Sequence, residues 1–181
     1  MDNQDSCLEN SFELRAKSLK SKMLELNLAR PDLIKGCPEK EISELEKKCN
    51  VILPKSYKVF LENFGHGLGG RVMNDIDILY NQISGLANLL RNELLIDEGD
   101  PCLPEKAFVF ASRYEEQFMF FDASGLVEEP PIFYYMENDI AFKKVGNSIF
   151  DILDDEAKGS KELKLITEER RKKREEIKKK K

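Results

Sequence analysis

The chain has 181 residues, of which 41% are hydrophobic and 35% are charged. A chain of this size and composition can bury one core without disulfides or structural metals. No apolar stretch approaches the roughly 20 residues that a membrane helix requires, and the polar, acidic start does not have the form of a secretory signal. We therefore expect a cytoplasmic protein that does not enter a membrane, built from one domain and a tail.

The charge of the chain is unevenly distributed. The formal net charge is −5, but residues 161–181 contain eleven Lys and Arg against five Glu, a balance of +6. Residues 1–160 therefore contain 18 basic and 29 acidic side chains, a balance of −11. An acidic body repels nucleic-acid phosphates and steers basic protein surfaces towards itself. This charge favours a protein partner and disfavours nucleic acid.

The first predicted element is an amphipathic helix over residues 8–27. Pro31 disfavours helical backbone in the residue before it, so the helix is expected to end by Arg30. We expect residues 1–33 to form an N-terminal helix that packs on the body. The apolar residues that recur at spacings of three and four are Leu8, Phe12, Ala16, Leu19, Met23 and Leu26.

Two further helices are predicted to begin at Pro38 and Pro54, because proline suits the first turn of a helix. The second of them is expected to stop at Gly65, since glycine is common just beyond a helix end. Their apolar faces consist of Ile42, Leu45 and Cys49 in the first helix and Tyr57, Phe60, Leu61 and Phe64 in the second.

Residues 65–70, GHGLGG, match the glycine spacing of a dinucleotide-binding loop. Such a loop joins a strand to the N-terminus of a helix, whereas these glycines follow a predicted helix and precede a predicted strand. We interpret the segment as a helix end followed by a flexible loop in which His66, the only histidine, is exposed. No activated serine or cysteine pattern accompanies His66, so it does not indicate catalysis.

The four cysteines do not form a recognisable metal or disulfide pattern. They stand far apart and include no C-x-x-C pair, and a single histidine is available to help them hold a metal. We expect free thiols, no metal site and no bound cofactor. The residues are Cys7, Cys37, Cys49 and Cys102.

The second half of the chain is predicted to consist mainly of strands. Runs rich in aromatic and β-branched residues indicate strands near 71–73, 76–80, 107–111, 117–121 and 132–136, the third and fourth forming a hairpin. Helices are expected over 83–95 and 148–153. Helices followed by mostly antiparallel strands indicate an α+β fold rather than repeating βαβ units.

Residues 157–181 are predicted to form a solvated helical tail. Glutamates precede lysines by four residues, as in Glu168 with Lys172 and Glu169 with Lys173, and such pairs stabilise exposed helices. Its lysine runs could attract nucleic acid or an anionic membrane surface. The interleaved glutamates dilute that attraction, and no aromatic side chain is present in the tail to stack on bases.

Carboxylates recur in the second half of the chain, at Asp75, Asp77, Glu115, Glu116 and Asp122. They could be solubilising charges, an acidic patch that faces a partner, or a pair for acid/base or divalent-metal chemistry. Spacing alone does not establish the separation that such chemistry requires, and no calcium-loop periodicity is present. We take these five acids as candidate contacts with a protein partner.

An ordered set of motifs resembles the SUKH superfamily, which includes the yeast Smi/Knr cell-wall regulator and many bacterial immunity proteins. An I-x-x-L-E pattern at 42–46 precedes LPKSYKVFLENFG at 53–65. Strands FVFAS and QFMFFD, a turn at Asp122, a proline before the next strand and a closing helix follow. The resemblance covers residues 34–153. It gives structural roles to Leu53, Pro54, Tyr57, Phe60, Leu61, Phe64, Gly65, Pro131 and Phe150.

The resemblance implies a non-enzymatic domain over residues 34–156, in which helices flank a curved, mainly antiparallel sheet that blocks toxins, frequently nucleases. An acidic protein suits a nuclease, because the cleft of a nuclease is basic. The alternatives are a regulatory scaffold whose helical ends recruit partners, and an enzyme that uses His66. Residues 113–116 depart from the family's glycine-containing turn, and the chain lacks tryptophan. These departures bear on which partner the protein binds more than on which fold it adopts.

Overall fold

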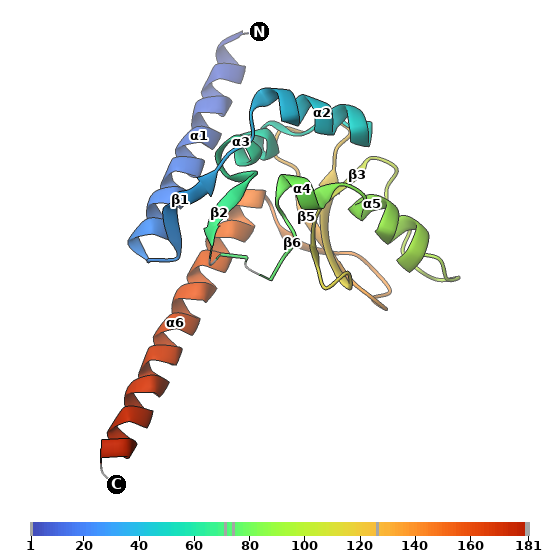
Figure 1. The fold of residues 1–181 in the computed structure, drawn as a ribbon. Helices are drawn as coiled ribbons and strands as arrows, with labels where there is room; N and C mark the ends of the chain where they lie inside the picture. The colour runs from blue at the N-terminus through green and yellow to red at the C-terminus, as the bar shows by residue number, and fades with distance from the viewer. Residues whose placement is uncertain (1, 71, 74, 126, 180–181) are drawn as a thin grey trace.

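The computed structural model describes residues 2–70, 72–73, 75–125 and 127–179, without the side chains of residues 2–10 and of part of the tail (Figure 1). The helical segments are α1 (Asp2–Glu25), α2 (Glu39–Cys49), α3 (Lys55–Phe64), α4 (Tyr80–Ile83), α5 (Leu86–Leu89), a π-helical segment (Leu90–Leu94) and α6 (Ile149–Lys179). The strands are β1 (Ala29–Lys35), β2 (Gly67–Gly70), β3 (Ala107–Arg113), β4 (Gln117–Asp122), β5 (Ile132–Met136) and β6 (Lys143–Gly146). This arrangement confirms the predicted α+β class.

The larger sheet contains four antiparallel strands in the order β3-β4-β5-β6. β3 and β4 form the predicted hairpin, and a register shift between Val109 and Ala111 marks a bulge, which increases the local twist. β6 lies at one edge and carries Lys143 and Lys144, which discourage pairing with another chain. β1 and β2 form a separate antiparallel pair.

Both faces of the larger sheet are packed. Alternate residues of a strand point to opposite faces. Phe108 and Phe110 of β3 accordingly enter a large core with α1, α3 and α6, whereas Val109 enters a smaller core with α5. In the large core, the ring centroid of Tyr57 lies 5.1 Å from that of Phe121 and 5.4 Å from that of Phe108. Aromatic contacts between α3 and the hairpin therefore join the two halves of the fold.

The Glu46 side chain stabilises the connection between α2 and α3. One oxygen of its carboxylate accepts a hydrogen bond from the backbone N–H of Leu53 at 2.8 Å and lies 2.8 Å from Nζ of Lys58. Pro54 then precedes α3 with φ −59°, the range to which its ring restricts it. Pro131 is partly exposed, whereas five further motif side chains are packing residues that are at most 3% exposed: Tyr57, Phe60, Leu61, Phe64 and Phe150.

Gly65 ends α3 for a reason other than the predicted one. Its φ is −58°, so it does not adopt the left-handed conformation for which glycine is usually selected after a helix. A Cβ at this position would instead lie 2.4 Å from Sγ of Cys37 and 2.7 Å from the Leu61 carbonyl oxygen. The glycine is required because the segment around Cys37 approaches the end of α3 closely.

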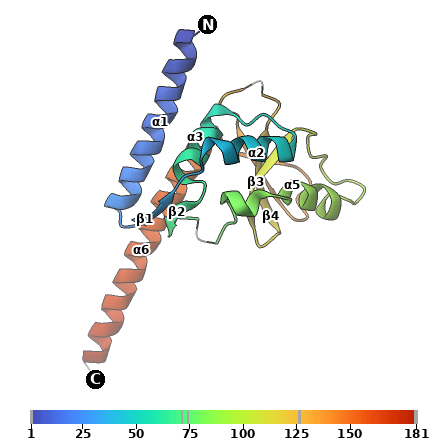
Figure 2. The same ribbon diagram turned by 45° about the horizontal axis from the view of Figure 1, so that its top comes forward.

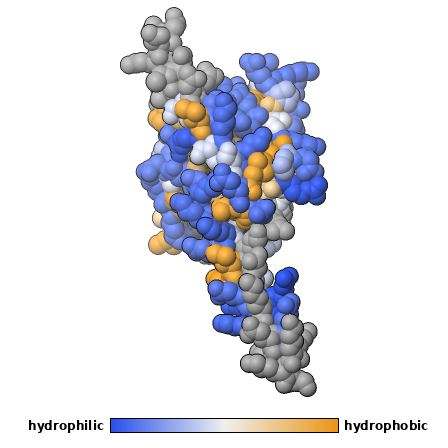
Figure 3. Space-filling view, turned by 90° about the vertical axis from the view of Figure 1, so that its left-hand side faces the viewer, coloured by the Kyte–Doolittle hydropathy of each residue, from blue (hydrophilic) through white to orange (hydrophobic). Residues whose placement is uncertain are grey.

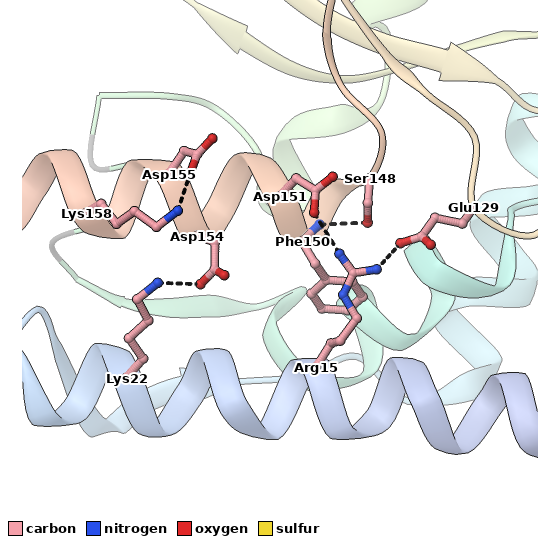
Figure 4. Close-up of polar contacts among 9 residues, drawn as sticks. All are labelled: Arg15, Lys22, Glu129, Ser148, Phe150, Asp151, Asp154, Asp155 and Lys158. Atoms are coloured by element: carbon pink, nitrogen blue, oxygen red, sulfur yellow. Dashed lines mark hydrogen bonds and ion pairs between the residues drawn. The ribbon is translucent and has the colours of Figure 1, made fainter.

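α1 and α6 lie side by side and run in the same direction (Figure 4). The inward face of α1, which includes Phe12, Leu19 and Met23, is buried, so α1 packs on the body. The start of α1 and the end of α6 extend beyond the body at opposite ends (Figures 1 and 2). Seen from the side on which these helices lie, the surface is mainly hydrophilic with small hydrophobic groups (Figure 3). None of the helices described is long and apolar enough to cross a bilayer.

Three predictions for the middle of the chain are wrong. A strand was expected near 71–73. The strand observed there is β2, which lies earlier, at Gly67–Gly70, in the segment that was expected to be a flexible loop. Residues 76–80 contribute one bridge, between Asp77 and Ser112, before α4 begins. The helix expected over 83–95 is divided, because Gly85, at φ +102°, separates α4 from α5.

Three strands and one continuation were not predicted at the positions where they occur. β1 contains a proline and is mostly exposed, so it lacks the alternating pattern of a strand. β2 is nearly all glycine because a Cβ at Gly67 would lie 2.3 Å from the Leu33 carbonyl oxygen on β1. β6 is short and polar. α6, predicted as a closing helix over 148–153, continues without a break through the basic tail.

Candidate partner-binding surface

Three of the predicted contact acids meet at one end of the β3–β4 hairpin. Glu115 and Glu116 are exposed in the turn between the strands. Asp77 lies beside the end of β3, because its backbone N–H donates to the Ser112 carbonyl at 2.7 Å and its carbonyl accepts from the Ser112 N–H at 2.9 Å. The Asp77 carboxylate is exposed and accepts a hydrogen bond from the Gln82 amide at 2.7 Å.

Arg113 brings a fourth acid, Asp75, to the same place. The Asp75 carboxylate pairs with the guanidinium of Arg113, and its charge is the main reason that the pKa of Arg113 is raised. The same guanidinium lies 5.4 Å from the centre of the Tyr114 ring. Four carboxylates and one guanidinium give this region a formal charge of −3. We call it the hairpin-tip surface and define it as Asp75, Asp77, Arg113, Tyr114, Glu115 and Glu116.

The turn at the hairpin-tip surface has an unusual backbone. Tyr114 and Glu115, in the three-residue loop between Arg113 and Gln117, have φ values of 56° and 57°, in the left-handed region that hairpin turns normally fill with Asn or Gly. The amide of Glu116 closes the turn by donating to the Arg113 carbonyl at 3.2 Å. The Tyr114 side chain is 68% exposed. The turn thus presents an aromatic ring and carboxylates to solvent at a cost in backbone energy, which is a pattern found at functional sites.

The acidic region continues onto the turn after β5. The backbone N–H of Glu137 donates to the Glu116 carbonyl at 2.8 Å, and the Glu137 side chain is exposed. Asp139, in the same turn, pairs with Lys143 at 2.7 Å, and that hydrogen bond holds the pKa of Asp139 below its ordinary value. Glu137 could not be recognised from the sequence, because the register of β4 against β5 is what brings the two turns together.

Asp122 does not join the hairpin-tip surface. It pairs with Ala107 at the other end of the hairpin, and the seven residues of β3 span roughly 20 Å. The Asp122 carboxylate accepts hydrogen bonds from the N–H and the hydroxyl of Ser124, both at 3.1 Å. Its position indicates that it orders the turn after β4.

A pocket of about 200 Å³ lies beside the hairpin-tip surface. Within it the Tyr134 hydroxyl donates to Oε1 of Gln117 at 3.0 Å. Nε of Arg113 is buried and has no hydrogen-bond partner among the described residues. The lining includes Ile76, Arg113, Gln117, Met119, Tyr134 and Glu156.

His66 is engaged with neighbouring side chains, which corrects the prediction of a histidine in a flexible loop. Its Nε2 lies 2.5 Å from Oε2 of Glu41, and its ring meets the Tyr80 ring edge-on at a centroid distance of 5.5 Å. The glycines that follow form β2, so no helix begins where a pyrophosphate would have to lie. The dinucleotide-like spacing is therefore part of a strand pair.

Three cysteines are described, and each is a free thiol. Burial is the main cause that raises the pKa of Cys37 to about 12, and burial also raises the pKa of Cys49. Both side chains are protonated at neutral pH and are poor nucleophiles in that form. Cys102 is exposed, and Cys7 lies outside the described side chains.

Comparison with known proteins places this fold in a family. A family model described as SMI1-KNR4 cell-wall, one of the SUKH models, matches residues 39–153. The match includes the chain from α2 to the start of α6 and leaves out α1, β1 and most of α6. No curated protein matches the chain. Because the model covers more than half of the chain, the protein belongs to the SMI1-KNR4 cell-wall family of the SUKH superfamily.

Proposed function

We propose that this protein is an immunity protein that binds a basic toxin domain in the cytoplasm and neutralises it without catalysis or a cofactor. The family supports this proposal, and the hairpin-tip surface is the observation that carries it. The surface joins exposed carboxylates, an exposed aromatic ring and a strained turn at one end of a rigid sheet. Aromatic anchors surrounded by charge are typical of protein interfaces.

Electrostatic steering of a basic partner towards the acidic surface supports this choice of partner. Carboxylates on an acidic body accelerate the encounter with a basic cleft, such as the phosphate-binding cleft of a nuclease. An ordinary interface covers roughly 800 Å² on each partner, more than one turn can supply. The neighbouring turn that carries Glu137 and the pocket beside Arg113 extend the area on the same side of the sheet.

Neutralisation in cells tests the proposal. The toxin domain encoded beside the gene for this chain is expressed in a sensitive host, with or without this protein. Wild type should restore growth. The tip variant, Glu115→Lys with Glu116→Lys and Glu137→Lys, should lose protection. The control variant makes the same charge change at exposed positions away from the hairpin tip: Glu44→Lys, Glu98→Lys and Glu105→Lys.

The outcomes distinguish the immunity function from the assignment of the binding surface. Protection by wild type and the control variant, but not by the tip variant, supports both the function and the surface. Equal protection by all three proteins would mean that the hairpin-tip surface does not bind the toxin. If wild type gave no protection, the immunity function itself would be rejected.

A regulatory scaffold is the second candidate, favoured by the two helices outside the family match. The start of α1 and the end of α6 extend beyond opposite ends of the body (Figure 1). Truncation after Ser160 distinguishes the candidates, because Ala157 is the last residue of α6 that is buried among those described. The truncated chain should still neutralise a toxin, whereas a scaffold that recruits partners through its tail should lose them.

A further inference from the structure

Three metal-binding side chains converge between α2, α3 and β1. Cys37 follows β1, Glu41 lies in the first turn of α2, and His66 lies between α3 and β2. One ligand atom from each of them lies within 4.8 Å of the other two, and Nε2 of His66 is 2.5 Å from Oε2 of Glu41. We propose that Cys37, Glu41 and His66 form a site for a divalent transition-metal ion of the zinc class. The site is separate from the hairpin-tip surface and does not depend on the proposed function.

The chemistry of the three donors suits zinc. Thiolate, imidazole and carboxylate are the ligands that zinc takes in proteins, at about 2.3 Å from sulfur and about 2.0–2.2 Å from nitrogen and oxygen. In a tetrahedral site the ligand atoms are therefore about 3.3–3.7 Å apart. The donor atoms lie within 4.8 Å of one another, and the contact between His66 and Glu41, at 2.5 Å, must lengthen for both to bind one ion. Magnesium and calcium prefer sites made of oxygen alone.

The backbone around the donors is held in place before any metal binds. The N–H of Cys37 donates to the Leu61 carbonyl at 2.8 Å, and the N–H of His66 donates to the Lys35 carbonyl at 2.9 Å. The Tyr80 hydroxyl donates to the backbone carbonyl of Glu41 at 3.2 Å. A ligand set fixed in this way loses little conformational freedom on binding.

Gly65 lies against the sulfur atom. Its backbone conformation is open to any residue, yet a Cβ would lie 2.4 Å from Sγ of Cys37 and 2.7 Å from the Leu61 carbonyl oxygen. Glycine at this position therefore allows the sulfur atom to keep its place beside the end of α3. On the other side, Glu41 and His66 keep 33% and 35% of their side-chain surface exposed. One coordination position thus faces solvent, as in zinc sites that hold a water as the fourth ligand.

Binding must release the proton of the thiol. In the free protein the Cys37 side chain is a thiol, and the metal-bound form is a thiolate, so one proton leaves for each ion bound. No oxidant or reductant is required. The proposal reverses the expectation of no metal site, which rested on cysteine spacing. Glu41 and His66 are 25 residues apart in sequence, and only the fold brings them together.

Cobalt spectroscopy on the full-length chain tests the proposal without relying on a variant. Co²⁺ should bind at one equivalent and give a thiolate-to-cobalt charge-transfer band together with the intense visible bands of four-coordinate cobalt. Zn²⁺ should displace it and remove both signals. If wild type showed no charge-transfer band, even with excess Co²⁺, the site would not exist.

Variants then assign the ligands. Cys37→Ser should abolish the charge-transfer band, and Glu41→Gln and His66→Asn should each weaken Co²⁺ binding at least tenfold, with circular dichroism to verify folding. The controls Cys49→Ser, Cys102→Ser and Glu44→Gln, the last on the same helix, should bind as wild type does. Unchanged binding in Cys37→Ser would place the ion elsewhere and overturn the assignment.

Discussion

Tyr114 and Glu115 occupy the two positions of the β3–β4 turn at which left-handed backbone is required. For a residue with a Cβ this conformation costs roughly 1–2 kcal/mol, so the turn is less stable than one built from Asn and Gly. Both side chains point to solvent and contribute little to the core. The proposed contact with a partner would account for residues of these types in a turn that does not favour them.

Glu115→Gly is expected to raise the free energy of unfolding by about 0.5–1 kcal/mol. Glycine adopts the observed φ without a clash, and its greater freedom in the unfolded chain offsets part of the gain. Urea unfolding measures the change. The matched control is Glu116→Gly, which removes the same charge beside it at a residue without positive φ and should give no gain. Equal stability of the two variants would argue against strain at Glu115.

The Tyr57 hydroxyl gives another prediction at this scale. The side chain is 1% exposed, burial holds its pKa well above the ordinary value, and its oxygen has no hydrogen-bond partner among the described residues. Removal of an unsatisfied buried hydroxyl is neutral or stabilising by up to about 1 kcal/mol, so Tyr57→Phe should keep or raise the urea midpoint.

The control for Tyr57 is Tyr134→Phe, which breaks the 3.0 Å hydrogen bond to Gln117 and should cost about 0.5–1 kcal/mol. A loss above roughly 1 kcal/mol in Tyr57→Phe would mean that the hydroxyl has a partner after all.

At the scale of elements, α1 is joined to the domain by ion pairs as well as by its apolar face (Figure 4). The Arg15 guanidinium pairs with Glu129 and, at 2.9 Å, with Asp151 of α6, and it lies 5.2 Å from the centre of the Phe150 ring. Lys22, two turns further on, pairs with Asp154 at 2.8 Å. The contacts place α1 along the first turns of α6.

Arg15→Ala should therefore lower the free energy of unfolding by about 1–2 kcal/mol, because it breaks charge-assisted hydrogen bonds from a half-buried guanidinium and removes its packing on Phe150. The comparison is Arg30→Ala, which removes an ion pair with Asp32 that is mostly exposed on both sides and should cost less than about 0.5 kcal/mol. Equal losses in the two variants would show that α1 is not held by Arg15.

Elements with a strong local pattern could be predicted from the sequence. α2, α3, the β3–β4 hairpin and β5 carry apolar spacing or aromatic runs, and the structure confirms them. β1 and β2 could not be predicted, because a proline-containing strand and a glycine strand form only through their contact with each other. The same limit applies to the candidate surface. A strand register separates Asp122 from Glu115 and brings Glu137 to Glu116, and no local pattern contains that information.

At the scale of the molecule, the chain has an acidic part and a basic part. Residues 1–160 have a balance of −11 and residues 161–181 a balance of +6. Residues 161–179 form the end of α6, which extends beyond the domain (Figure 2). Charges more than about 10 Å apart are largely screened at ordinary ionic strength, so the basic residues far along α6 do little to offset the negative charge of the domain. The negative potential of the domain remains available to steer a basic partner.

The salt dependence of association with the cognate toxin domain tests this account most directly. Stopped-flow measurements over a range of NaCl concentrations should give a wild-type rate constant that falls steeply as salt screens the attraction. The tip variant should associate more slowly and with a flatter dependence, whereas the control variant should stay closer to wild type. A wild-type rate that does not change with salt, or an equal loss of rate in the two variants, would contradict it.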